Sequence, residues 1–250
     1  MTKIAQYLVT FILFLVSIIA GYAQKTVAVD NFDKVIISPH IQITFEEGND
    51  ENVVIESTNV PEDKINIKVE GKTLRIYLDG AKMITKNEKV YNEKGWKTKR
   101  SIYKGTQVVA KVTYKNLQEL SIRGEEVILC KSPIEREDFK LKIYGESKIT
   151  MNSLQVNKLQ ATMYGESYLE IKEGIVNNQK YTVYGEGEVN TLGISNESTK
   201  ITAYGEGNFR IRVSNNLKVT AYGEATVAYH GNPAINKGII IGKAKIQKMD

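Results

Sequence analysis

The stretch Tyr184-Gly185-Glu186-Gly187 recurs with small changes along the second half of the chain. The other copies are Tyr144-Gly145-Glu146-Ser147, Tyr164-Gly165-Glu166-Ser167, Tyr204-Gly205-Glu206-Gly207 and Tyr222-Gly223-Glu224-Ala225. Their glycines lie 20, 20, 20 and 18 residues apart. A fixed repeat of this length is typical of proteins built from stacked coils. The repeat therefore predicts a solenoid.

Apolar and polar residues alternate along each repeat. Around Gly185, Tyr181 and Val183 fall on one side of the chain, and Lys180 and Thr182 fall on the other. The alternation stays in phase through five copies, and a period of two belongs to a strand and not to a helix. The predicted fold is all-β: a parallel β-helix, or β-solenoid, with coils of roughly 20 residues.

The glycine of each repeat falls on the apolar side, where it indicates a bend or a close approach of two backbones. The tyrosine before it and the glutamate after it fall on the polar side. Stacked coils would align these residues in two ladders on the outer surface. The tyrosine ladder comprises Tyr144, Tyr164, Tyr184, Tyr204 and Tyr222, and the glutamate ladder comprises Glu146, Glu166, Glu186, Glu206 and Glu224.

Before the repeats, residues 24–105 predict an N-terminal β-strand region that continues into the coils of residues 106–250. Short runs that alternate or are apolar lie at 35–37, 41–45, 53–55, 65–69 and 74–78, and turn-forming residues separate them. The repeats at the two ends of the stack depart from the pattern, as expected of coils that protect open edges. The last repeat carries three lysines, Lys237, Lys243 and Lys245, which give its edge a positive charge.

A basic insertion interrupts this region at residues 81–105. It holds eight Lys or Arg residues, two Glu residues and Trp96, the single tryptophan of the chain. One interpretation is a solvated hairpin or loop. The other is a contact surface for an anionic glycan or a lipid head group, with Trp96 as the aromatic contact.

The first residues predict a secretory signal over 1–23. Lys3 precedes an apolar run from Tyr7 to Ala20, and Gly21-Tyr22-Ala23 has the small-x-small form of a cleavage site. We therefore expect an exported protein that is periplasmic, outer-membrane-associated or secreted, with no stable membrane span after cleavage. The alternative is an uncleaved anchor. Export and the absence of a grouped basic motif argue against nucleic-acid binding.

The chain has few residues suited to metal or redox chemistry. Cys130 is the single cysteine, and its apolar neighbours predict a buried small side chain. His40 and His230 are the only histidines and lie in turn or strand-edge contexts. We therefore predict no cofactor and no Cys/His metal cluster.

Each ladder has two interpretations. The tyrosines either support the coil stack or hold a sugar chain. The glutamates repel one another by roughly 0.9 kcal/mol per pair at a 4.8 Å spacing in water. The repulsion can be compensated by side chains that fan apart, by nearby lysines, or by a hard cation such as Ca²⁺. A row of equivalent carboxylates contains no asymmetric acid–base pair, so we predict no catalytic residue.

The repeat pattern resembles the putative auto-transporter adhesin family, head GIN domain, which is common in Bacteroidota. The resemblance covers about residues 30–248. It rests on the Tyr-Gly-Glu repeats, on Phe32-Asp33-Lys34-Val35 near the start, and on His230-Gly231-Asn232-Pro233 followed by Ile241-Gly242-Lys243 at the end. It implies a secreted β-helical protein and offers no catalytic residue to transfer.

These observations predict a non-enzymatic, adhesin-like binding module of the bacterial cell envelope, with a glycan or an envelope protein as its partner. Two alternatives stay open. One is a carbohydrate-active enzyme, a polysaccharide lyase or glycosidase, on the same scaffold. The other is a purely structural or regulatory envelope protein.

Overall fold

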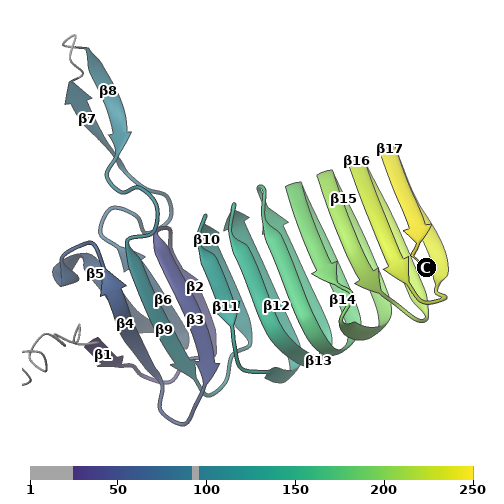
Figure 1. Cartoon of the computed structure of the whole chain (residues 1–250), viewed down its shortest axis with the longest axis horizontal. Coiled ribbons are helices and arrows are strands. Elements are labelled where there is room, and N and C mark those ends of the chain that lie inside the picture. The colour runs from purple at the N-terminus through teal and green to yellow at the C-terminus, as the bar shows by residue number, and fades with distance from the viewer. Residues whose placement is uncertain (1–24, 92–95, 250) are drawn as a thin grey trace, which may run out of the picture.

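The computed structural model describes residues 25–91 and 96–249, so the expected signal over 1–23 lies outside the described residues. Strand makes up 74% of the structure, and the described residues contain no α-helix, only the short 3₁₀ turn η1 (Glu62–Lys64). The strands wind into a parallel β-solenoid of about six turns that follows an N-terminal sheet region. Figure 1 shows the solenoid as a row of slanted strands leading away from those sheets. The fold class predicted from the repeat is confirmed.

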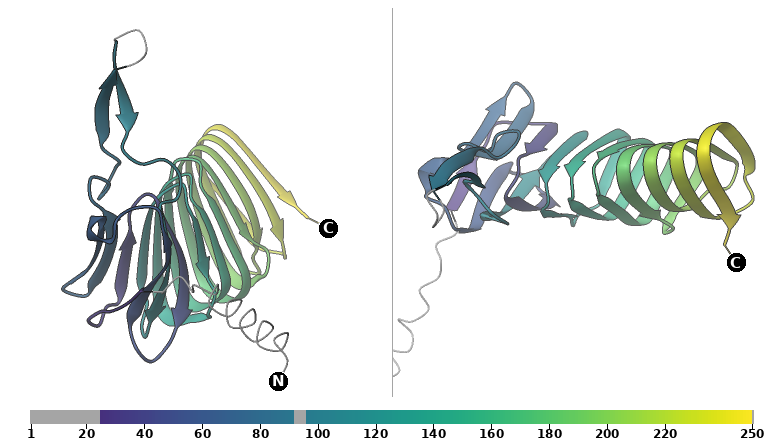
Figure 2. Two further views of the ribbon diagram at one scale, coloured as in Figure 1. Left: turned by 60° about the vertical axis from the view of Figure 1, so that its left-hand side comes forward. Right: turned by 90° about the horizontal axis from the view of Figure 1, so that it is seen from above.

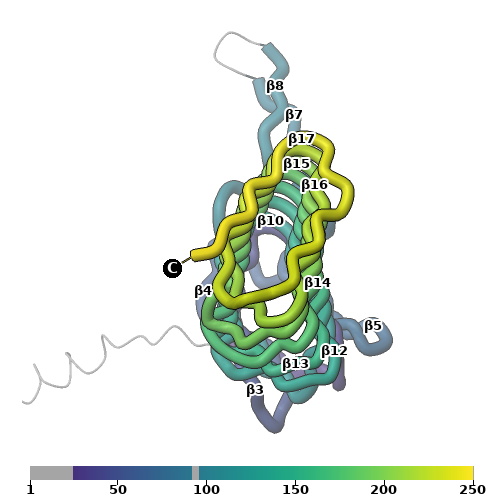
Figure 3. The backbone as a smooth tube through the Cα atoms, turned by 90° about the vertical axis from the view of Figure 1, so that its right-hand side faces the viewer, coloured from purple at the N-terminus to yellow at the C-terminus, as the bar shows by residue number. Residues whose placement is uncertain are grey.

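Successive coils of the solenoid pair in parallel. The strands are β10 (Glu119–Gly124), β11 (Val127–Cys130), β12 (Ile134–Gly145), β13 (Lys148–Tyr164), β14 (Tyr168–Thr191), β15 (Ile194–Arg212), β16 (Asn216–His230) and β17 (Ala234–Lys248). Their register keeps equivalent repeat positions side by side, so that Tyr184 lies beside Tyr204 and Gly205 beside Gly223. Viewed along its axis, the chain forms a flattened tube (Figure 3).

The apolar side of each strand fills the interior of this tube. On three successive coils, Tyr181, Ile201 and Val219 lie in register, and all three are fully buried. Cys130 is also fully buried, and burial raises the pKa of its thiol to about 12. The thiol therefore stays protonated and packs as a small apolar group, as the sequence predicts.

The N-terminal strands form the first layer of the same stack. They are β1 (Lys25–Ala28), β2 (Lys34–Ile37), β3 (Ile41–Glu47), β4 (Asn52–Thr58), β5 (Ile65–Glu70), β6 (Thr73–Leu78) and β9 (Val108–Tyr114). β2 pairs in parallel with β10, and β3 pairs in parallel with β11. Antiparallel pairs β4–β9, β1–β4 and β5–β6 then close this end of the solenoid. The strand runs expected from the sequence all form, and they are continuous with the coils.

The glycine of each repeat sits at a corner where neighbouring backbones touch. Gly205 has φ +112°, and a Cβ atom built there would lie 2.7 Å from the carbonyl oxygen of Gly185. The sequence alternation puts these glycines on the inward side, but Gly165 and Gly185 are exposed. The missing side chain would point along the stack at the preceding coil. The close backbone approach, and not core packing, therefore requires glycine.

The basic insertion contains an antiparallel hairpin made of β7 (Asn87–Tyr91) and β8 (Lys97–Ser101). It forms a two-stranded sheet of its own, separate from the main sheet. Figures 1 and 2 show it projecting from the N-terminal end of the molecule, away from the solenoid. We call β7 and β8 the basic hairpin.

The other end of the solenoid is β17, which pairs with β16 and has no second strand partner among the described residues. Lysines take repeat positions that are apolar or acidic in the preceding coil. Lys237 lies in register with Val219, and Lys243 lies in register with Glu224, 3.2 Å from its carboxylate. Charged residues on an open edge oppose pairing with further strands.

Candidate binding surface

The tyrosine ladder is a continuous stack of parallel rings. The four centroid distances between neighbouring rings are 5.0, 4.7, 4.7 and 4.9 Å, and neighbouring planes differ by at most 4°. The register of the parallel coils sets this spacing, because each tyrosine precedes a stacked corner glycine. The structure therefore brings together all five tyrosines that the sequence singles out.

The stack decides which part of each ring a ligand can reach. The faces of Tyr164, Tyr184 and Tyr204 are turned toward neighbouring rings, yet 37–39% of each residue is exposed. Solvent therefore reaches ring edges and hydroxyl groups. Within the described part of the chain, none of the five hydroxyls donates a hydrogen bond to another protein group. The ladder thus presents a row of hydroxyl groups and does not offer aromatic faces.

The first ring of the ladder is covered by a cation. The guanidinium carbon of Arg123 lies 5.0 Å from the centroid of the Tyr144 ring. Arg123 occupies the tyrosine position in the preceding coil, where it pairs in register with Tyr144. At the opposite end Ile241 pairs with Tyr222. A residue other than tyrosine therefore lies in register with each end of the ladder, so the ring stack ends at Tyr144 and Tyr222.

A row of threonines and a row of lysines run beside the tyrosine ladder. The threonines are Thr162, Thr182, Thr202 and Thr220, and the lysines are Lys180, Lys200 and Lys218. At the start of the threonine row stands Lys142, whose amine lies 2.6 Å from the Glu119 carboxylate. The hydrogen bond that the Lys142 amine donates to Glu119 raises the pKa of that amine. This outer surface is therefore polar, periodic and rich in hydrogen-bonding groups.

The glutamate ladder lies beyond the corner glycines, and all five carboxylates are exposed. Its last member, Glu224, pairs with Lys243. Among the described residues, no cluster of three or more His, Cys, Asp or Glu side chains could hold a metal ion. Cation binding by this ladder stays a prediction with no geometric support.

A cavity of about 610 Å³ lies where the N-terminal sheets meet the first coils, and we call it the junction cavity. Its wall is mixed: Met83 and Ile84 contribute exposed apolar side chains, while Arg123 and Glu126 contribute charge. Tyr144 also lines it, so the cavity opens at the start of the tyrosine ladder.

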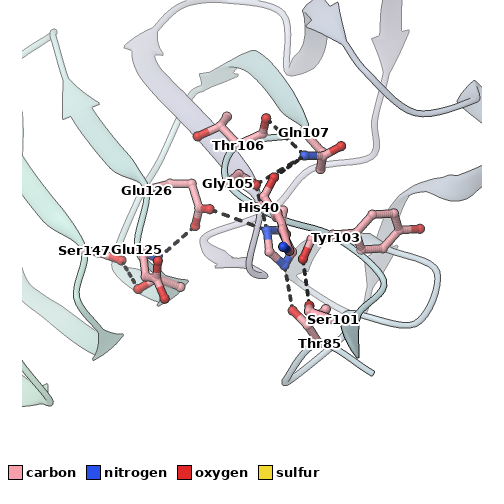
Figure 4. A network of polar contacts seen from close by, with 12 residues as sticks. His40, Thr85, Ser101, Tyr103, Gly105, Thr106, Gln107, Glu125, Glu126 and Ser147 are labelled. Carbon is pink, nitrogen blue, oxygen red and sulfur yellow. Dashed lines mark hydrogen bonds and ion pairs between the residues drawn. The ribbon is translucent and has the colours of Figure 1, made fainter. Parts of the chain in front are cut away.

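His40 is held at this cavity by the contacts drawn in Figure 4. Its Nδ1–H donates to the carbonyl oxygen of Gly105 at 2.8 Å, and Nε2 lies 2.7 Å from the hydroxyl of Thr85. The buried Glu126 carboxylate is 3.9 Å from Nδ1. Both ring nitrogens have hydrogen-bond partners in the basic insertion, so the imidazole fastens the insertion to the turn before β3.

The backbone of His40 supports this assignment. Its φ is +73°, and it is the one residue other than glycine with positive φ in the described ranges 25–91 and 96–249. Such a conformation is uncommon for a residue with a Cβ and persists where its surroundings hold it. Sequence reasoning placed His40 in a turn or strand edge and did not connect it to a site. Pro39 before it was the one signal of an unusual turn.

The family model described as "Putative auto-transporter adhesin, head GIN domain" matches residues 31–233. The chain belongs to this family. The resemblance inferred from the repeats is confirmed, and family membership supports an adhesin-like role for this GIN domain. No curated protein matches its sequence.

Solved structures share the fold of this GIN domain at low sequence identity. A putative adhesin from Parabacteroides merdae is 19% identical with a TM-score of 0.65, over 91% of this chain and 96% of that one. A putative adhesin from Bacteroides fragilis is 15% identical with a TM-score of 0.73, over 90% and 96%. A putative lipid binding protein from Parabacteroides distasonis is 17% identical with a TM-score of 0.61, over 91% and 96%.

Trp96 lies apart from both ladders of this GIN domain. It directly precedes β8 of the basic hairpin, whereas the ladders lie on β12 to β16 and the corners between them. It is 71% exposed.

Across residues 25–91 and 96–249, no helix is long and apolar enough to cross a membrane.

Proposed function

We propose that this GIN domain is a non-enzymatic, adhesin-like module of an exported protein, and that it binds an extended glycan along the tyrosine ladder. The observation that supports the proposal most is the repetition of the same outward hydroxyl group at spacings of 4.7–5.0 Å between rings. Family membership agrees with an adhesin-like role.

A periodic surface suits a ligand that is itself extended. Four of the five coils contribute both a tyrosine hydroxyl and a threonine hydroxyl, such as those of Tyr184 and Thr182, and the lysine row adds donors. A single neutral hydrogen bond contributes only about 0.5–1.5 kcal/mol in water. A chain of sugar residues could engage several coils at once, and linked weak contacts add up to useful affinity.

The polar character of the surface favours a glycan over a protein partner. The central residues of protein interfaces are enriched in aromatic and other large side chains that enter pockets and lose their water. In the ladder the tyrosine rings already pack on one another, and their neighbours are Thr and Lys. Such a surface is better suited to hydroxyl-rich ligands than to an apolar anchor.

The equivalence of the coils also supports a non-enzymatic role. Glycoside hydrolysis by two carboxylates requires an acid and a base or nucleophile in different environments. The five ladder glutamates are all exposed on equivalent corners. His40 has both nitrogens in hydrogen bonds at the junction cavity.

A glycan array with the purified protein tests the proposal, together with the double variant Tyr184→Phe/Tyr204→Phe. This change keeps both rings in the stack and removes two hydroxyls. We expect binding to a polysaccharide on the array, and a loss of affinity of roughly 5- to 150-fold if each hydroxyl contributes about 0.5–1.5 kcal/mol.

Tyr168→Phe is the matched control, because Tyr168 starts β14 on the other side of the corner and contacts Lys148 instead of the stack. Affinity should stay unchanged in that variant. Full affinity in the double variant would contradict binding along the ladder, and the absence of any glycan ligand on a broad array would contradict the proposed ligand class.

A further inference from the structure

The basic hairpin and its base concentrate positive charge. Residues 81–105 hold eight basic residues and two acidic residues. Glu88 is already paired with Arg100 at 2.8 Å. The remaining cations, including Lys89, Lys97 and Lys99, give the hairpin an excess positive charge.

The same region exposes large apolar and aromatic side chains. Met83 is 57% exposed, Ile84 81%, Tyr91 67% and Trp96 71%. They lie in the hairpin or on the segments next to it. Among the other large apolar residues that the structure describes, Ile175, Ile239 and Ile241 are exposed to a similar extent, at 57–62%. Large exposed apolar groups beside cations indicate an interaction surface.

The hairpin has no protein layer on either side. Every described residue of β7 and β8 is exposed or only partly buried, and the two strands pair with each other alone. An isolated two-stranded hairpin is marginally stable in water. Its cross-strand side-chain contacts include the Arg100–Glu88 pair, the Lys97 amine 5.8 Å from the Tyr91 ring, and the hydroxyl of Thr98, which donates to the Val90 carbonyl oxygen. A surface that covers the two strands would therefore stabilise the hairpin.

We propose that the basic hairpin docks on the surface of an anionic lipid bilayer. Lysines near a membrane attract acidic head groups, each contributing about 1 kcal/mol. Tryptophan and tyrosine are the aromatic residues that favour the interface between head groups and hydrocarbon. The positive charge of the hairpin and its exposed aromatic residues together favour an anionic bilayer over a neutral surface. The inference is independent of the glycan proposal, because the ladder lies on the solenoid.

Binding of the hairpin to a membrane can be followed by tryptophan fluorescence, without an added label. Trp96 is the only tryptophan in the chain, so tryptophan emission reports on the hairpin alone. We expect a blue shift of this emission when the protein meets vesicles made of equal parts phosphatidylcholine and phosphatidylglycerol. Vesicles of phosphatidylcholine alone should leave the emission unchanged. Sedimentation with the same vesicles gives the apparent affinity.

The variant Lys97→Gln/Lys99→Gln removes two of the hairpin cations. At about 1 kcal/mol for each lysine, its affinity for the anionic vesicles should fall roughly 30-fold. The matched control is Lys158→Gln/Lys172→Gln, which removes the same charge from exposed solenoid positions outside the tyrosine, threonine and lysine rows and should change the affinity little. Both variants lie on exposed positions outside the core, and circular dichroism checks that they fold.

Three results would overturn the proposal. The first is equal binding to phosphatidylcholine vesicles. The second is loss of vesicle binding in the solenoid control to the same degree as in the hairpin variant. The third is an equal Trp96 shift on addition of dextran sulfate without vesicles, which would identify a soluble polyanion as the ligand. Binding that is anionic-lipid-dependent, salt-sensitive and specific to the hairpin lysines would support it.

Discussion

Replacing Gly205 with alanine should lower the free energy of unfolding by about 3 kcal/mol or more. Two causes add. The backbone of Gly205 has φ +112°, which side-chain-bearing residues rarely adopt. The new Cβ would also lie 2.7 Å from the Gly185 carbonyl oxygen and 3.2 Å from its Cα, and backbone atoms of a paired coil cannot move away cheaply. Denaturant unfolding followed by circular dichroism measures the change.

Gly71→Ala is the matched control for Gly205→Ala. Gly71 also has positive φ, +62°, but a Cβ built there meets nothing within 4 Å. Its cost should be limited to the left-handed conformation, about 1–2 kcal/mol. If both substitutions cost the same, the contact between stacked corner glycines would not be the reason for the repeat.

Replacing Phe209 should have a comparably large effect, since the full truncation of a buried Phe to Ala costs about 3–5 kcal/mol. Phe209 is 1% exposed and lies in register with Val189 and Val227, which are fully buried. Its ring fills the space next to Gly207, where a Cβ would lie 2.7 Å from Cε2 of Phe209. Gly207 therefore has no side chain because its neighbour is large.

This relation predicts a coupling that can be measured. Gly207→Ala alone should overpack the core and cost about 1–3 kcal/mol, and Phe209→Val alone should leave a cavity. The double variant Gly207→Ala/Phe209→Val recreates the Ala225 and Val227 combination of the next coil. Its loss of stability should be at least about 1 kcal/mol smaller than the sum of the single losses. Strict additivity would contradict the packing described for this coil.

The fold could be predicted because the same sequence pattern recurs in many coils. Five copies of one pattern keep Tyr181, Ile201 and Val219 in phase, and no single substitution obscures that period. The alternation predicts the positions of the corner glycines along the chain correctly, but it puts them on the inward side, whereas Gly165 and Gly185 are exposed. Sequence alternation distinguishes two sides of a strand, whereas the third direction, along the stack, appears only when coils pair.

The candidate site was predictable in part. Alignment of the tyrosines follows from the period, but the turning of each ring face toward the next ring depends on side-chain torsions that the period does not set. The junction cavity was not predictable, because His40, Thr85 and Glu126 are far apart in sequence and do not belong to the repeat. Repetition reveals what is shared among coils and conceals what is unique to one.

The stacking of the tyrosines bears directly on how a ligand would bind. If the rings were splayed, sugar rings could pack on their faces. In the observed stack Tyr184 has a ring on each side, at 4.7 Å, so a ligand meets hydroxyl groups in a row. Affinity would then come from the number of coils that a ligand spans and not from one strong contact.

The affinity for oligosaccharides of increasing length tests this account most directly. Isothermal titration calorimetry with a series of fragments, prepared from a polysaccharide that the protein binds, measures it. We predict that affinity rises with each added sugar until the fragment spans the five coils of the tyrosine ladder, and then levels off. A monosaccharide or disaccharide that binds as tightly as the polymer would contradict the account, because it would place recognition in one pocket.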